Sequence, residues 1–114
     1  LSWNSFLEAI ILLSGIPDCD SAYWDKIMEA VKTWGMELYQ VPFILSARAA
    51  FEAADRAGVY LQIECDMWNV FAPDAQMNNV LWEETKRILD TFGNHPSFLM
   101  LSPSNEPGGD WSFP

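Results

Sequence analysis

The stretch that decides the fold spans residues 94–110 and reads NHPSFLMLSPSNEPGGD. Its apolar run from Phe98 to Leu101 is too short for a helix and lies between two prolines, so it predicts a buried strand. Glu106 follows just past the carboxyl end of this strand. In α/β proteins with parallel strands, ligands and catalytic groups collect at that end of the sheet. The stretch therefore predicts a parallel sheet and a candidate acidic residue at its carboxyl edge.

A pattern of helix, glycine and strand occurs three times along the chain. The expected helices cover residues 21–34, 46–57 and 79–92, the last of them after a long loop over residues 66–78. The expected strands are residues 10–13, 36–41, 59–65 and 98–101, with residues 1–9 as a lead-in to the first strand. Repeated crossovers of this length predict a right-handed parallel sheet.

Local details of the helices follow from the same pattern. Gly35, Gly58 and Gly93 are expected to end the three helices in the left-handed conformation. Glu83 and Arg87 are expected to form an i,i+4 pair on the outer face. Apolar residues at helical spacing are predicted to face the core: Trp24, Ile27, Met28, Val31 and Trp34, then Ala47, Ala50, Phe51 and Ala54, then Leu81, Ile88, Leu89 and Phe92.

Residues 94–110, the preceding segment 83–87, and the segments 49–55 and 58–65 resemble the catalytic barrel of glycoside hydrolase family 2 and its relatives among the retaining glycosidases. In that family an Asn-His-Pro-Ser turn leads into the fourth strand, which ends in Asn-Glu. The resemblance covers roughly the last two thirds of the chain and implies a TIM-type barrel that stops after its fourth strand. It also implies that Glu106 is the general acid/base and that Asn105 holds a sugar hydroxyl.

The expected fold is therefore α/β: a single domain over residues 1–114, forming half of a TIM-type (β/α)8 barrel with four parallel strands and helices on the outer face. A half-barrel leaves two open strand edges, and a closed two-fold homodimer would pair both of them. The alternative is an open flavodoxin-like sheet, which needs helices on both faces.

Composition excludes several classes of partner. The net charge of −10 argues against nucleic acid and anionic membranes, which both require clustered Lys and Arg. Half of the residues are hydrophobic and six are Trp, which indicates apolar surface for a partner to cover. The sequence has neither an apolar run of membrane-spanning length nor a basic leader, so the cellular location is left unassigned.

Histidine and cysteine chemistry is also disfavoured. His95 is the only histidine and precedes its strand, so we interpret it as part of a turn, away from the carboxyl edge. This removes Ser-His-Asp, Cys-His and histidine-zinc sites. Cys19 and Cys65 form no metal-binding or disulfide pattern, and we expect both to be reduced and buried.

Acidic and aromatic residues follow the expected strands at their carboxyl ends. Clustered carboxylates in a walled site favour acid/base chemistry, because one raised pKa supplies a general acid. We predict Glu106 and Glu64 as catalytic residues and Asn105, Trp68, Asp18 and Trp111 as substrate-binding residues. A metal site of Asp18, Asp20, Glu64 and Glu106 has no spacing motif, so no metal or cofactor is expected. A solvated acidic rim is the competing interpretation.

Two functional hypotheses follow. The first is a glycosidase-like enzyme acting on carbohydrate, in which Glu64 of the partner subunit faces Glu106 across a dimeric barrel. The second is a non-catalytic, reworked or engineered half-barrel that assembles with itself. Apolar residues 41–45, where the family carries polar side chains, and the missing seventh-strand nucleophile favour assembly. The chain starts without Met and ends at Pro114, which suggests a fragment.

Overall fold

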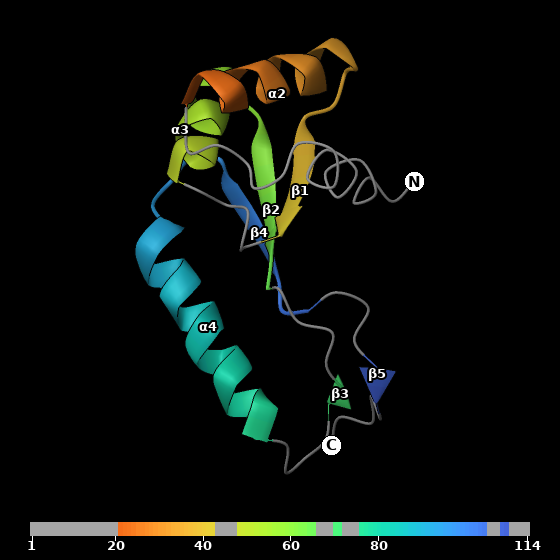
Figure 1. Ribbon diagram of the computed structural model, residues 1–114, viewed down its shortest axis with the longest axis vertical. Helices are drawn as coiled ribbons and strands as arrows, with labels where there is room; N and C mark the ends of the chain where they lie inside the picture. Colours follow the sequence, from red (N-terminus) through yellow and green to blue (C-terminus); the bar gives the residue numbers. More distant parts are fainter. Residues whose placement is uncertain (1–20, 43–47, 66–69, 72–75, 105–107, 110–114) are drawn as a thin grey trace.

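The computed structural model describes residues 21–42, 48–65, 70–71, 76–104 and 108–109 (Figure 1). Its main sheet has three parallel strands in the order β1-β2-β4, namely β1 (Leu38–Pro42), β2 (Tyr60–Glu64) and β4 (Phe98–Ser102). A separate parallel pair joins β3 (Val70–Phe71) to β5 (Gly108–Gly109). The central strand of the main sheet is thus β2, and its neighbours come from earlier and later parts of the chain.

The described helices are α2 (Ser21–Thr33), α3 (Arg48–Ala57) and α4 (Gln76–Phe92). The expected helices and the strands around residues 36–41, 59–65 and 98–101 are confirmed, with ends that coincide or are shifted by up to three residues. Gly35 and Gly58 both have φ of 69°, so they end α2 and α3 in the left-handed region as predicted. Ser46, the expected start of the second helix, lies outside the described residues.

The expected four-stranded half-barrel closed by dimerisation is wrong. The described residues form a small α/β domain with three parallel strands in its main sheet and three helices. The strand expected at residues 10–13 and the lead-in before it lie outside the described residues. Repeated crossovers make neighbouring strands parallel, but they do not determine how many strands the sheet contains. In Figure 1, α4 extends beyond the end of β2.

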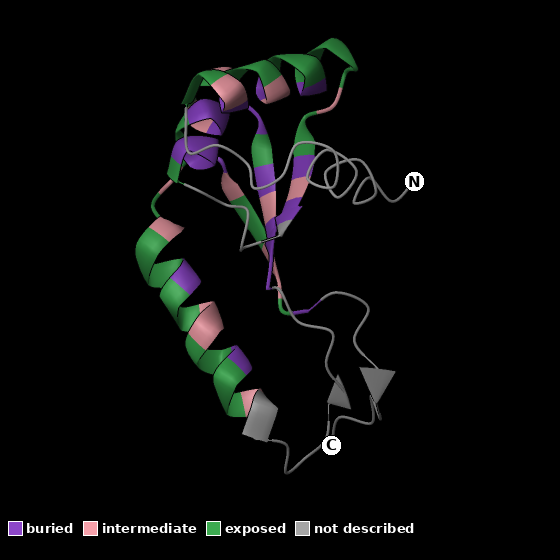
Figure 2. Ribbon diagram, in the orientation of Figure 1, coloured by how far each residue is buried: buried purple, intermediate pink, exposed green. Residues whose placement is uncertain are grey.

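The core lies between the sheet and the helices. Side chains alternate along each strand, so Tyr39 and Val41 of β1 and Leu61 and Ile63 of β2 face the helices and are buried. They meet the buried side chains of α2 and α3: Trp24, Met28, Val31, Ala50, Phe51, Ala53 and Ala54. Figure 2 shows these buried positions on α3 and on the inner sides of α2 and the strands. The described helices therefore cover one face of the sheet, unlike those of a flavodoxin-like fold.

An aromatic stack joins α3, α4 and β4. The Phe51 ring lies 4.5 Å from that of Phe92 and 6.2 Å from that of Phe98, in both cases nearly parallel. Phe51 itself is fully buried. Between α2 and α3 the contacts are polar as well: Lys32 Nζ donates to the Ala57 carbonyl at 2.8 Å, which satisfies a free acceptor at the end of α3.

Four local predictions about the helices are wrong, and one of them is the left-handed end of the third helix at Gly93, where no positive φ is recorded. Trp34 is 79% exposed because α2 ends at Thr33 and the chain turns at Gly35. Leu89 is 47% exposed, while Ile88 beside it is buried. Arg87 pairs with Glu84 at i,i+3, one residue nearer in the sequence than the expected partner Glu83.

Candidate functional site

Glu64 ends the central strand at the carboxyl edge of the main sheet. It lies opposite Pro42 of β1 and Ser102 of β4 in the strand register. By alternation its side chain belongs to the sheet face that α2 and α3 do not cover. The residue is nevertheless only 6% exposed. A carboxyl group is thus buried at the edge where parallel sheets place their functional groups.

Gln40 supplies a hydrogen bond to this carboxylate. Its side-chain Nε2 donates to Glu64 Oε2. In the register Gln40 pairs with Gln62, so its side chain reaches diagonally toward the carboxyl end of β2. Burial of a charged carboxylate is unfavourable unless hydrogen bonds replace the lost water, and Gln40 provides one such bond.

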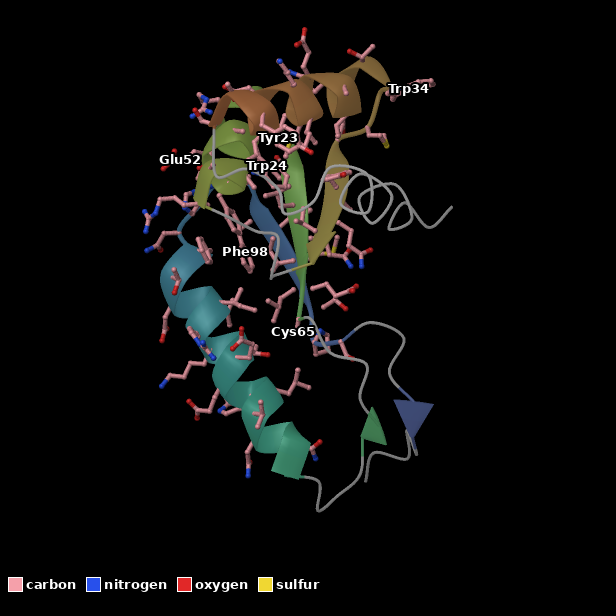
Figure 3. The ribbon with its side chains drawn as sticks, viewed as in Figure 1. Tyr23, Trp24, Trp34, Glu52, Cys65 and Phe98 are labelled. Carbon is pink, nitrogen blue, oxygen red and sulfur yellow. The ribbon has the colours of Figure 1, made fainter. Side chains whose placement is uncertain are left out.

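Cys65 follows Glu64 and faces the opposite way, toward α4. Its Sγ lies 3.8 Å from Thr85 Oγ1, and its backbone N–H donates to the Ser102 carbonyl at 3.0 Å. Burial raises the pKa of the Cys65 thiol, the charges of Glu84 and Glu64 raise it further, and the Thr85 hydrogen bond opposes them. The thiol is free and buried, so it is a structural contact between β2 and α4 rather than a nucleophile (Figure 3).

The segment after β4 bends back at the same edge. Ser102 Oγ donates to the Ser104 carbonyl at 3.0 Å, and Ser104 is 4% exposed. This contact fixes the backbone between Ser102 and Ser104. Gln40, Glu64 and Ser102 of three adjacent strands, together with Ser104 just after β4, therefore lie toward this edge, and we call these four residues the carboxyl-edge cluster.

The predicted site residues divide into two groups. Glu64 lies in the carboxyl-edge cluster. The others lie outside the described residues: Glu106, Asn105, Trp68, Asp18 and Trp111. Cys19 and Asp20 lie outside them as well. Within the described ranges, no group of three or more His, Cys, Asp and Glu is placed to hold a metal ion.

Sequence reasoning missed Gln40 as a member of the site. The segment 40–45 is mostly apolar, so the sequence predicted a lack of sugar-binding groups there and no role for its polar residue, Gln40. Strand alternation could have identified it. Gln40, Gln62 and Glu64 each lie between buried apolar residues on adjacent strands, at positions that alternate with them. Polar residues at such spacing share one face of a sheet.

A second polar cluster lies at the other end of β4. Asp55 Oδ2 is 2.7 Å from His95 Nδ1, and Asp55 Oδ1 accepts the Ser97 backbone N–H at 2.9 Å. Burial alone would raise the pKa of Asp55, but the hydrogen bonds from Ser97 and His95 outweigh burial and lower it. His95 also packs against Phe51, with ring centres 5.0 Å apart. Because this cluster precedes the strand, it belongs to the amino edge of the sheet.

Comparison of the chain with protein-family models and with curated proteins finds no match. No helix in the described part of the chain is long and apolar enough to cross a membrane. The function is therefore argued from the carboxyl-edge cluster and the residues that adjoin it in the sequence.

Proposed function

We propose that the protein hydrolyses glycosidic bonds at the carboxyl edge of its parallel sheet, with Glu64 and Glu106 as the two reacting carboxyl groups. The observation that carries this proposal is the buried Glu64 carboxylate, which Gln40 holds at the end of the central strand. Glu64 lies opposite Ser102 on the adjacent strand, and Glu106 is four residues beyond Ser102 in the sequence. The resemblance of residues 94–106 to a retaining-glycosidase strand supports the choice of substrate.

Hydrolysis of a glycoside requires two carboxyl groups with different tasks. In our proposal Glu106 donates a proton to the glycosidic oxygen as the bond from that oxygen to the sugar carbon breaks. The Glu64 carboxylate accepts a proton from the water molecule whose oxygen bonds to the same carbon. Such a division of roles needs two different environments. The buried, amide-bonded position of Glu64 supplies one of them.

Activated nitrophenyl glycosides test the proposal. The panel includes α and β anomers of several hexoses, and the proteins are wild type, Glu64→Gln, Glu106→Gln and Glu52→Gln. Glu52 is exposed on α3, far from the carboxyl edge (Figure 3), so its variant is a matched control for loss of one negative charge. We expect at least one substrate to be hydrolysed, and kcat/KM to fall about 100-fold or more in the first two variants but not in the third. Equal rates in all four proteins would overturn the proposal.

The second candidate function is self-association without turnover, and exposed apolar side chains on the strands favour it. Leu38 and Tyr60 are direct neighbours in the β1–β2 register and are 40% and 46% exposed, while Met100 of β4 is 42% exposed. We expect a second copy of the chain to cover these residues. Sedimentation equilibrium at micromolar concentration would then report a dimer for wild type and Trp34→Ser, and a monomer for Tyr60→Ser. A monomeric wild type excludes this candidate.

A further inference from the structure

We propose that Gln40 is a positioning residue that fixes the Glu64 carboxylate at the carboxyl edge and keeps it ionised, so that Glu64 serves as the base and not as the acid. This inference rests on the proposed function for its chemical meaning. Its structural basis is the bond from Gln40 Nε2 to Glu64 Oε2 between adjacent strands.

The chemistry of the amide selects the ionised form of its partner. The Gln40 nitrogen carries two N–H donors, and a donor to a carboxyl oxygen favours the charged carboxylate over the neutral acid. A protonated Glu64 would keep an acceptor oxygen, but the same hydrogen bond would be weaker because the acceptor would carry no charge. The bond therefore matches a carboxylate that accepts a proton, which is the role of a base.

Three neighbouring residues, Ser102, Cys65 and Glu84, have interactions of their own. Ser102 of β4 gives its hydroxyl to the Ser104 carbonyl. Cys65, just after β2, has a raised pKa, so its thiol is neutral near pH 7. Glu84 of α4 adds a negative charge that acts on the same thiol. The Gln40 amide, in contrast, donates directly to the Glu64 carboxylate and so favours its ionised form.

The position of Gln40 also fixes the geometry. It lies on β1, whose backbone pairs with β2 over all five residues of each strand, so the amide is carried by a rigid element. Gln62 is the natural comparison, because it is the residue opposite Gln40, half-buried on the same sheet face, and it precedes Glu64 by two residues. If any polar side chain on this face stabilised the Glu64 carboxylate, both glutamines would contribute. If Gln40 positions the carboxylate through its hydrogen bond, loss of Gln40 alone should have an effect.

The test is a ¹³C-carboxyl NMR titration of Glu64 in wild type, Gln40→Met and Gln62→Met. Methionine keeps the length of the side chain and removes the donor. We expect the Glu64 pKa to rise by about one unit or more in Gln40→Met and to stay unchanged in Gln62→Met. The acidic limb of the pH profile of kcat/KM should move by the same amount in Gln40→Met alone. Equal Glu64 pKa values in wild type and Gln40→Met overturn the inference.

A second variant keeps the test decisive if Gln40→Met does not fold, as judged by its thermal unfolding. Gln40→Glu has nearly the same shape and replaces the amide donor by a second carboxyl group, so Glu64 should titrate at higher pH as part of a coupled pair. An unchanged Glu64 titration in this folded variant also overturns the inference. If wild type hydrolyses no glycoside, the proposed function fails, and the NMR titration still decides whether Gln40 keeps Glu64 ionised.

Discussion

Asp55 Oδ2 lies 2.7 Å from Nδ1 of His95, which follows it by 40 residues in the chain. The contact ties α3 to the turn before β4, and the His95 ring packs on Phe51 of the same helix. The carboxylate also accepts the Ser97 N–H, so both of its oxygens are engaged at the amino edge of the sheet. This edge thus has a structural role, while the candidate chemistry lies at the opposite edge.

We predict that Asp55 stabilises the fold at neutral pH and loses this effect in acid. Its pKa in the folded chain is lowered, because the hydrogen bonds from Ser97 and His95 outweigh burial, which acts in the other direction. A lowered pKa means that the unfolded chain takes up the proton first as the pH falls. The stabilisation is therefore complete above the ordinary aspartate pKa of about 4 and is lost as the pH falls through the lower folded value.

Urea unfolding of wild type and Asp55→Asn from about pH 5 to about pH 2 measures this effect. We expect Asp55→Asn to be less stable by on the order of 1 kcal/mol at the upper end, and the difference to shrink below about pH 4. Asp90→Asn, at an exposed position of α4, is the control and should follow wild type throughout. A difference that stays constant down to the lowest pH would contradict the lowered pKa.

We predict that Tyr39 weakens the fold in alkali. Burial, together with the nearby Tyr23, raises the pKa of Tyr39 to about 12. In the unfolded chain the phenol ionises near its ordinary pKa of about 10, so stability falls between these values as the pH rises. At about pH 11 this loss is about 1 kcal/mol, and Tyr39→Phe should lack it.

Unfolding curves at about pH 9 and pH 11 test this prediction, with the exposed Tyr60 changed to Phe as the control. Identical pH dependence in wild type and Tyr39→Phe would refute it.

The aromatic stack leads to a prediction about stability. Phe51 is fully buried and touches rings from α4 and β4, so Phe51→Ala removes contacts among three elements at once. We expect a loss of about 3 to 5 kcal/mol, a large part of the stability of a small domain. Trp34→Ala removes a larger side chain that is 79% exposed, and it should change stability by less than about 0.5 kcal/mol. Chemical unfolding measures both, and a loss below about 1 kcal/mol for Phe51→Ala would mean that the stack is not part of the core.

Much of the domain could be predicted from local signals in the sequence. The helical spacing of Trp24, Met28 and Val31 places them correctly in the core, since an amphipathic helix has one apolar stripe. Gly35 and Gly58 mark real helix ends, because a left-handed residue closes α2 and α3. Parallel pairing of β1, β2 and β4 also follows from the repeated crossovers.

The wrong predictions concern features that depend on contacts between residues far apart in the sequence. The number of strands depends on which segments pair, and local periodicity does not report it. The pairing of β3 with β5 joins two-residue segments, too short to carry a periodic pattern. Leu89 fits the apolar stripe of α4 by spacing alone, but it is 47% exposed, whereas Leu81 and Ile88 of the same helix are buried. Gln40 was missed because its role depends on a partner 24 residues away on another strand.

Gly93 is the position where sequence and structure disagree in a way that can be measured. It was predicted to be a left-handed cap like Gly35 and Gly58, but positive φ is recorded at those two glycines and not at Gly93. A Cβ at Gly35 or Gly58 would meet nothing within 4 Å, whereas at Gly93 it would lie 2.5 Å from the Leu89 carbonyl oxygen. Glycine is thus required at positions 35 and 58 because of the backbone conformation, and at position 93 because a Cβ would clash with the Leu89 carbonyl oxygen.

The two causes predict different responses to alanine and asparagine. Gly35→Ala and Gly58→Ala should each destabilise by about 1 kcal/mol, and Asn at the same positions should recover much of this, because Asn tolerates the left-handed region. Gly93→Ala should cost more than either, since the last turn of α4 must shift, and Gly93→Asn should recover nothing because it carries the same Cβ. Free energies of unfolding for the six variants decide the matter. Recovery by Asn at Gly93 would show that this glycine is a left-handed cap after all, and failure of Asn at Gly35 and Gly58 would show that their strain does not come from φ.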